Sequence, residues 1–155
     1  MPDLKALSRS TQIILGAGLL LLIDTFFAWQ KVSLEVGGVE VVSASVNAWH
    51  GFWGVVMGLA LIALLVWVGL QVANVKLNLN VPDKTVTAGL AGVVFVFAVL
   101  KNLIDDYSAW ASYVGIVLAG AVAFGAWMRL QEPEVTAAPV PPAAPEPPPP
   151  TTQGL

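Results

Sequence analysis

The chain has 155 residues, of which 57% are hydrophobic and only 11% are charged, and its formal net charge is −3. Soluble domains contain about 45–50% apolar and about 25% charged residues, so this composition is typical of an integral membrane protein. The acidic balance gives no support for nucleic-acid binding, the lack of cysteine excludes disulfides and thiolate metal sites, and one histidine is too few for a histidine-rich metal site.

The first 29 residues predict a surface segment followed by a membrane span. Residues 1–10 predict a cytoplasmic amphipathic N-terminus, because Leu4 and Leu7 stand among charged residues. The apolar run from Thr11 to Trp29 has the roughly 20 residues that a spanning helix needs. No small-x-small cleavage site follows this run, so we expect a retained span and not a cleaved signal peptide.

The segment 31–46 predicts a β-hairpin after the first span. Apolar and polar residues alternate on both sides of Gly37-Gly38, and a type I′ turn needs a positive φ at both central positions. Because an isolated hairpin is marginal in water, we expect its apolar face to rest on helix ends, on aromatic rings or on a partner. Pairing about the turn predicts that this face has Val36 opposite Val39, Leu34 opposite Val41 and Val32 opposite Ser43.

The polar face of the predicted hairpin holds two glutamates, Glu35 and Glu40, opposite each other. Carboxylates that face each other across two strands repel slightly. The simplest interpretation is a solvated face. The alternative is an interaction surface, either a weak cation site or a contact with a basic partner.

Three further apolar runs predict spans at about Gly51–Val72, Val86–Ile104 and Trp110–Leu130. The connection between the last two runs is very short, so these two spans must be antiparallel neighbours. We therefore expect an all-α membrane protein. Its transmembrane domain, residues 11–130, would be a four-helix bundle with a short extracellular β-hairpin between helices 1 and 2.

Basic residues predict the orientation of the chain in the membrane. With the N-terminus inside, the outer side carries only Lys31 and Lys101. Positive residues are enriched on the cytoplasmic side of membrane proteins, so both termini are expected to be cytoplasmic in a plasma membrane. The basic residues of the inner side are Lys5, Arg9, Lys76, Lys84 and Arg129.

Residues 131–155 form a proline-rich segment in which neither helix nor sheet is expected. We predict a disordered cytoplasmic tail. One interpretation is a spacer or solubilising tail, and the other is a docking site for a cytoplasmic protein partner. The prolines that repeat at every third position, and would carry such docking, are Pro139, Pro142, Pro145 and Pro148.

Small residues at intervals of four predict where helices approach closely, because close packing drives helix association in lipid. Such stripes mark either a seam inside one bundle, which we favour, or a contact between copies in a homo-oligomer. The stripes comprise Gly54 and Gly58 in the second span, Ala88 and Gly92 in the third, and Ala111, Gly115, Ala119 and Ala123 in the fourth.

Two charged residues fall inside the predicted spans near their outer ends. Asp24 lies roughly 20 Å along the first span and Lys101 roughly 22 Å along the third, counted at about 1.5 Å per residue. Both spans run outward, so the two charges are expected at similar depth. Ionisable residues inside membranes usually face the bundle interior and have a partner. We therefore predict an ion pair between Asp24 and Lys101.

Other arrangements stay open for these charges. Asp24 is close enough to Trp29 to sit just under the headgroups, and it can also belong to a water-lined ion site or contact another subunit. Lys101 can reach outward to Asp105, one helical turn on, or to Asp106, and Lys31, two turns beyond Asp24, can reach back toward that carboxylate. His50, at the outer end of the second span, is expected to be simply amphipathic, with pH sensing or a role beside Asp24 as the alternative.

Catalytic motifs are missing from the sequence, which has no nucleophile elbow, HExxH or P-loop. We expect no enzyme, no cofactor and no metal site. The sequence favours a non-enzymatic multi-pass membrane protein, embedded in the lipid bilayer, that acts as a structural or protein-interaction module. The alternative is an oligomeric channel or an ion-coupled transporter that uses Asp24 and Lys101.

Four stretches resemble a group of uncharacterised small four-span integral membrane proteins of actinobacteria. This resemblance covers about residues 1–132 and implies four spans and a bacterial origin, with no established activity. Trp29 followed by Gly51-Phe52-Trp53 is also distantly similar to claudin-type tetraspans, although the outer loop is much shorter and has no cysteines. The four stretches are LKALSR (Leu4–Arg9), IDTFFAWQKVSLEVGGVEV (Ile23–Val41), AWHGFWG (Ala48–Gly54) and GAWMRLQE (Gly125–Glu132).

Overall fold

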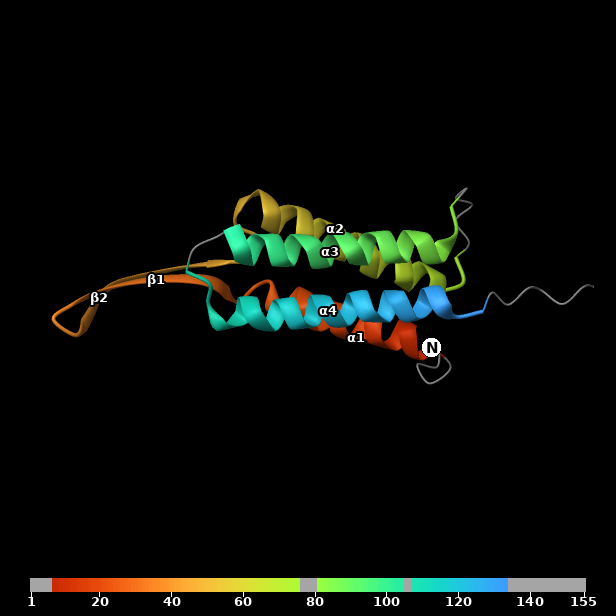
Figure 1. Cartoon of the computed structure of the whole chain (residues 1–155), viewed down its shortest axis with the longest axis horizontal. Coiled ribbons are helices and arrows are strands. Elements are labelled where there is room, and N and C mark those ends of the chain that lie inside the picture. Colours follow the sequence, from red (N-terminus) through yellow and green to blue (C-terminus); the bar gives the residue numbers. More distant parts are fainter. Residues whose placement is uncertain (1–6, 76–80, 105–106, 134–155) are drawn as a thin grey trace, which may run out of the picture.

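The computed structural model describes residues 7–75, 81–104 and 107–133. These residues form four helices that lie alongside one another and a two-stranded arm that projects beyond their ends (Figure 1). The predictions made for residues 1–6, Lys76, Asp105, Asp106 and the proline-rich tail fall outside the described residues. In chain order the elements are α1 (Arg9–Asp24), β1 (Ala28–Val36), β2 (Val39–Asn47), α2 (Gly51–Val72), α3 (Asp83–Ile104) and α4 (Trp110–Gln131).

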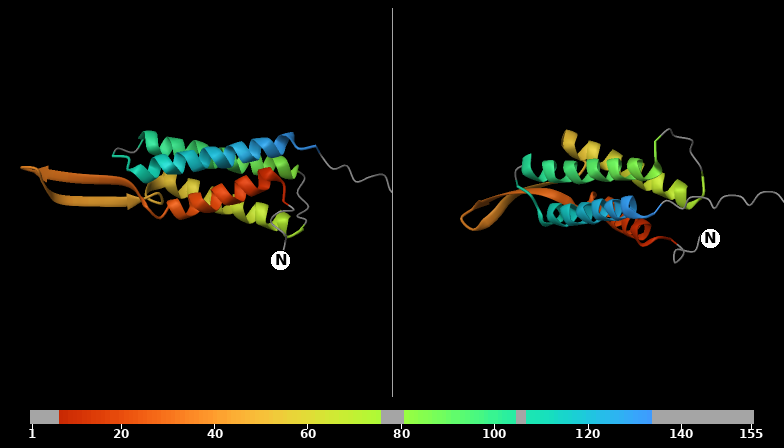
Figure 2. Two further views of the ribbon diagram at one scale, coloured as in Figure 1. Left: turned by 90° about the horizontal axis from the view of Figure 1, so that it is seen from below. Right: turned by 45° about the vertical axis from the view of Figure 1, so that its right-hand side comes forward.

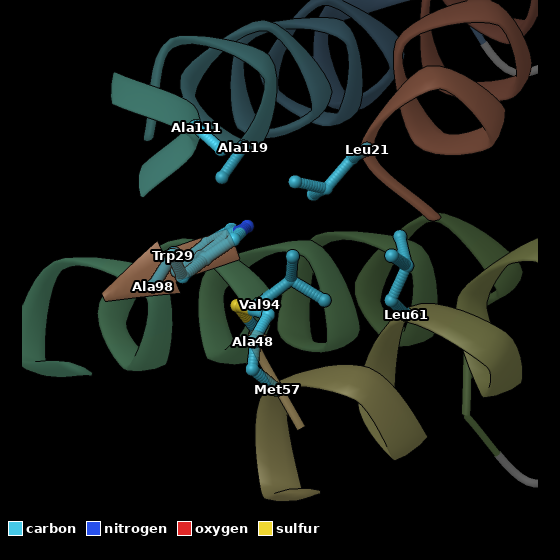
Figure 3. Close-up of a cluster of buried hydrophobic side chains, with 9 residues drawn as sticks. All are labelled: Leu21, Trp29, Ala48, Met57, Leu61, Val94, Ala98, Ala111 and Ala119. Atoms are coloured by element: carbon cyan, nitrogen blue, oxygen red, sulfur yellow. The ribbon is translucent and has the colours of Figure 1, made fainter. Parts of the chain in front are cut away.

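Each of the four helices packs against two others, and Figure 2 shows the bundle from two further directions. α1 packs against α4 and α2, and α3 packs against α2 and α4. We call the end where α1 and α3 finish and α2 and α4 begin the hairpin end, because the arm leaves from there. The core at this end is built around Trp29 and Met57 (Figure 3), and a second cluster around Ile14 and Trp67 fills the opposite half.

Three of the helices, α2, α3 and α4, are long and apolar enough to cross a membrane. α2 covers the residues predicted for the second span. α1 has only 16 residues and ends at Asp24, whereas the first span was predicted to continue to Trp29. The helix stops because the amides of Phe26 and Phe27 turn back to bond carbonyls only three residues earlier, and the chain then enters β1.

Polar residues fix where two of the helices begin. The hydroxyl of Ser8 accepts a hydrogen bond from the amide of Thr11 and so caps α1, which therefore includes two residues predicted to lie in the N-terminal surface segment. α3 begins at Asp83, directly after Pro82 and three residues earlier than the predicted span. An acidic residue in the first turn interacts favourably with the helix dipole.

The predicted hairpin is present, and both glycines of its turn have positive φ, 62° at Gly37 and 79° at Gly38. The predicted register is correct only near the turn, where Val36 pairs with Val39. Beyond a bulge at Val41, the register differs by one residue from the prediction, because the extra residue in β2 takes no partner in β1. The observed pairs there are Leu34 with Val42, Ser33 with Ser43 and Val32 with Ala44.

The arm does not rest on the rest of the molecule. Figures 1 and 2 show both strands running away from the helix ends, and the apolar residues nearest the turn are exposed, with Leu34 at 62% and Val36 at 69%. The prediction that the apolar face rests on helix ends or aromatic rings is therefore wrong for this part of the hairpin. The third predicted option, a partner, is not tested by the structure of one chain.

The helices carry apolar side chains on their outward surfaces. A soluble protein rarely exposes so many large apolar side chains on its helices, whereas a lipid-facing surface requires them. The chain therefore has the surface of a membrane protein. Exposed apolar side chains on the three long helices include Leu59, Ile62, Val66, Val93, Phe95, Val96, Val117 and Phe124.

Candidate functional site at the hairpin end

Both predicted intramembrane charges are buried at the hairpin end. The side chain of Asp24, the last residue of α1, is 5% exposed, and that of Lys101, in the last turn of α3, is 1% exposed. The depth estimate from residue counting is therefore correct in placing them at the same end of the helices. A buried charge must be compensated by hydrogen bonds or by an opposite charge, so their contacts define the site.

Asp24 accepts a hydrogen bond from Trp29. The indole Nε1 lies 3.1 Å from the Asp24 carboxylate oxygen Oδ2 and 3.1 Å from its backbone carbonyl oxygen. The turn between α1 and β1 makes this possible, because it brings Trp29 back over the end of the helix. Trp29 itself is 1% exposed and belongs to the core at the hairpin end (Figure 3).

Gly115 of α4 provides the space for this pair. A Cβ added there would overlap the Trp29 ring and would lie 2.8 Å from the Asp24 carboxylate. Ala111 and Ala119, one turn away on either side, are also buried. The small-residue stripe predicted in the fourth span is therefore a seam inside the bundle, as favoured, and the end of α1 and the start of β1 pack against it. The stripe predicted in the third span does not make such a seam, because no side chain or backbone approaches Gly92 within 4 Å of a built Cβ.

A second tryptophan anchors the other strand of the arm. Trp49, two residues after β2, donates from Nε1 to the hydroxyl of Thr25 at 3.0 Å, and the amide of Ala48 donates to the Thr25 carbonyl at 3.1 Å. The Trp49 ring lies against Gly58 of α2, where a Cβ would come within 2.5 Å of it. Both strands thus reach the helices through a tryptophan that packs on a glycine.

The connection between α3 and α4 holds the arm from a third direction. The amide of Lys31 donates to the carbonyl of Tyr107 at 3.0 Å, and the amide of Ala109 donates to the carbonyl of Trp29 at 2.7 Å. Gln30 and Ser108 form an isolated antiparallel bridge between these bonds. The start of β1 is therefore paired on both edges, which fixes the direction in which the arm leaves the helices.

Lys101 contacts the start of α2. Its Nζ donates to the backbone carbonyl of His50 at 2.8 Å, and its Cε lies close to the space left by Gly54. The structure therefore brings together two of the predicted site residues, Lys101 and His50, through the backbone of the histidine and not through its exposed imidazole. The ion pair between Lys101 and Asp24 stays a prediction.

The two glutamates of the arm do face each other, since Glu35 pairs with Glu40. Oε1 of Glu40 also lies 3.9 Å from Nζ of Lys31, and both side chains are exposed to solvent. An exposed ion pair of this kind contributes about 0–1 kcal/mol to stability. This environment agrees with the solvated face that the sequence favours. Among the described residues no group of three histidine, aspartate or glutamate side chains could hold a metal ion.

A polar cluster at the opposite end was not predicted. The hydroxyl of Ser10 on α1 donates to the carboxylate of Glu132 at 2.6 Å, and Lys84 of α3 donates to the Glu132 backbone carbonyl. Arg129 of α4 donates to the side-chain oxygen of Gln71 on α2. These bonds join residues of all four helices or of their ends. The bonded partners are separated by between 48 and 122 residues along the chain, so no local pattern could reveal them.

Comparison of the chain with known proteins found no relative. No family model matches it, and neither a curated protein nor a solved structure does. The resemblance to four-span membrane proteins of actinobacteria therefore stays a prediction.

Proposed function

We propose that this chain is a non-enzymatic multi-pass membrane protein that acts as a structural or protein-interaction module in a bacterial plasma membrane. The observation that carries the proposal is a contrast within the arm. Its root, residues 29–31 and 48–49 that join it to the helices, is firmly bonded, whereas its surface towards the turn does not rest on the helices. The root is bonded to α1 and to the α3–α4 connection and is packed on α2 and α4. The apolar side chains towards the turn are left exposed.

The polar groups of the helices support a binding role over a catalytic one. Asp24 accepts from Trp29, Lys101 donates to a backbone carbonyl, and Ser10 donates to Glu132. These groups are used in contacts that hold the helices and the arm together. General acid–base catalysis needs a group within hydrogen-bond reach of a substrate, whereas these hydrogen bonds are made to other groups of the chain itself.

We include α1 as the fourth span of the proposed transmembrane bundle. Its 16 residues extend for about 24 Å, less than the roughly 30 Å of a hydrocarbon core. Leu19, Leu20 and Ile23 face outward from its second half, and Phe26 and Phe27 are exposed just beyond it, which lengthens its apolar surface. A short span is accommodated by local thinning of the bilayer at modest cost.

The proposed orientation keeps both termini in the cytoplasm and the arm outside. Arg9, Lys84 and Arg129 are then at the cytoplasmic end, and Lys31 and Lys101 are at the outer end, in agreement with the positive-inside tendency. The proline-rich tail would offer a second contact surface for a cytoplasmic partner.

Site-directed crosslinking in native membranes tests the proposed role. The chain has no cysteine, so a single substitution carries a cleavable photo-crosslinker at one chosen position. We expect Leu34→Cys on the arm to give a discrete protein adduct. The matched control, Val117→Cys on the outward surface of α4, should give mainly lipid adducts. If the arm gives no protein adduct at native expression, the proposed role as an interaction module is wrong.

A second candidate function, an oligomeric channel or ion-coupled transporter, is favoured by one observation. Asp24 and Lys101 are both buried at the same end of the helices, and intramembrane ionisable residues often mark ion pathways. Purified protein in liposomes distinguishes the two functions. An ion or proton flux that Asp24→Asn abolishes would favour transport, and the absence of flux from folded, reconstituted protein would exclude this candidate.

A further inference from the structure

Because of the bulge at Val41, the two faces of the arm differ in polarity. Side chains alternate between the faces of a strand, so the residues paired with one another share a face. The extra residue shifts β2 by one position and brings its apolar residues onto the apolar side of β1. One face, which we call the apolar face, then holds Val32, Leu34, Val36, Val39, Val42, Ala44 and Val46, with Gln30 opposite Val46 where the arm joins the helices. The other, the polar face, holds Lys31, Ser33, Glu35, Glu40, Ser43 and Ser45.

We propose that the apolar face of the arm packs against the same face of a second copy of this chain, so that two hairpins form a small β-sandwich outside the membrane. This inference rests on the proposed function as an interaction module and names its partner.

The chemistry of the apolar face matches a copy of itself. From Val32 and Ala44 to the turn its residues are valine, leucine and alanine only, and its one polar residue, Gln30, lies where the arm joins the helices, so the exposed part requires no complementary charge from a partner. Sheets that pack face to face at about 10 Å interdigitate aliphatic side chains of this kind. A two-fold interface needs such a self-complementary patch, because each residue meets the same surface on the other chain.

The size of the apolar face is sufficient for a specific dimer. Five of its side chains are between 40% and 69% exposed, at Val32, Leu34, Val36, Val39 and Val42. Pressing two such faces together would bury on the order of 1,000 Å² in total, which is the size expected of the smaller specific interfaces. A lone two-stranded hairpin is also marginal in water, whereas two packed hairpins share one apolar layer.

The direction of the arm favours a second copy over the lipid surface. The arm runs on from the helix ends approximately along the helices (Figures 1 and 2). Strands of nine residues extend for about 30 Å, so the turn lies far from any bilayer that the helices cross. Two copies inserted in the same orientation are related by an axis across the membrane, and such an axis brings the sides of two parallel arms together.

The polar face supports the same arrangement. It carries Glu35 opposite Glu40, with Lys31 near the second of them. In the proposed dimer these charges stay in water on the outer sides of the two sheets. Contact through the polar faces would instead bring four carboxylates together, which is unfavourable.

Two adjacent substitutions on opposite faces test this dimer. Leu34→Asp puts a charge on the apolar face, and Ser33→Asp puts the same charge on the polar face one residue away. We expect the wild type and Ser33→Asp to be dimers when singly labelled protein is counted by photobleaching in lipid nanodiscs. Leu34→Asp should shift the population to monomers by at least tenfold in apparent dissociation constant. A wild-type monomer under these conditions would overturn the inference.

A second measurement does not depend on a destabilising charge. Val42→Cys and Ser43→Cys place single thiols on the apolar and the polar face of β2 in a chain without other cysteines. In membranes, a short bis-maleimide should join two copies at position 42 at least fivefold more efficiently than at position 43, while tryptophan fluorescence shows that the root of the arm is unchanged. Equal efficiency at the two positions would overturn the proposed face.

The identity of the adduct separates this inference from the proposed function. A photo-crosslinker on Leu34→Cys, on the same face as Val42, can react with any neighbour, and an adduct there with a different protein would leave the interaction module standing and overturn the second copy as its partner. An adduct with phospholipid alone would overturn the dimer and also count against the module. Only an adduct between two copies of this chain supports the inference.

Discussion

Gly115 of α4 lies so close to the indole of Trp29 that a Cβ at this position would overlap the ring. The same position is in contact with the Asp24 carboxylate that the indole binds. The end of α1 and the start of β1 therefore both pack against α4 at this one glycine. This relationship explains how a chain with a buried carboxylate near a helix end can still pack densely.

The first prediction concerns that close approach. Gly115→Ala should destabilise the protein by about 1–3 kcal/mol or more, because the ring must move to admit a methyl group into a filled core. The measurement is the midpoint of thermal unfolding in detergent, followed by tryptophan fluorescence. Gly92→Ala is the matched control, because nothing lies near its Cβ position. The control should be neutral or stabilising by up to about 1 kcal/mol, since alanine is the better helix former.

The second prediction concerns the hydrogen bond between Trp29 and Asp24. Trp29→Phe keeps an aromatic ring but removes the Nε1 donor, so the buried carboxylate loses a partner at a cost of about 1–3 kcal/mol. Trp110→Phe is the control, because Trp110 is 67% exposed and its ring lies beside Phe27. Unfolding in detergent should therefore be affected much more by the first substitution. Equal effects would mean that the Asp24 contact contributes little.

Local chemistry explains which parts of the fold could be predicted. Long apolar runs predicted α2, α3 and α4, and the Gly37-Gly38 pair predicted the turn, because both signals depend on neighbouring residues alone. The end of α1 was missed because the turn at Phe26 and Phe27 lies within an apolar run, and the residues that bond Thr25 beside this turn, Ala48 and Trp49, are more than twenty residues away.

The hairpin register had a local signal that the prediction did not use. Val41 and Val42 are two apolar residues in succession where strict alternation would require a polar one. A bulge accommodates such a pair and restores the alternation beyond it. The roles of Trp29 and Trp49 had no such signal, because tryptophans near predicted span ends are equally typical of an interfacial belt.

The third prediction tests the ion pair inferred from the sequence. If Asp24 and Lys101 interact directly, a double-mutant cycle of Asp24→Asn and Lys101→Met should give a coupling energy of at least about 1 kcal/mol. Asparagine still offers Trp29 an oxygen acceptor, so the cycle isolates the charge. Stability is measured by unfolding in detergent for the four proteins. A coupling energy near zero would mean that the two buried charges are stabilised separately, by Trp29 and by contacts such as the His50 carbonyl.

The fourth prediction tests the register of the arm, on which its two faces depend. Ser33 pairs with Ser43 in the structure, whereas the register without a bulge pairs Val32 with Ser43. Directly opposite residues on antiparallel strands have Cβ atoms about 4.5–5.5 Å apart, close to the distance that a disulfide spans. Because the chain has no other cysteine, each double variant reports on one pair only.

We expect Ser33→Cys with Ser43→Cys to form an intramolecular disulfide under mild oxidation, detected by mass and by a mobility change on reduction. Val32→Cys with Ser43→Cys should oxidise much more slowly, because side chains at these positions project to opposite faces of the sheet. The reverse order of rates would mean that the bulge is absent. Val42, Ala44 and Val46 would then leave the apolar face, and Ser43 and Ser45 would replace two of them, so the basis for a dimer through that face would be lost.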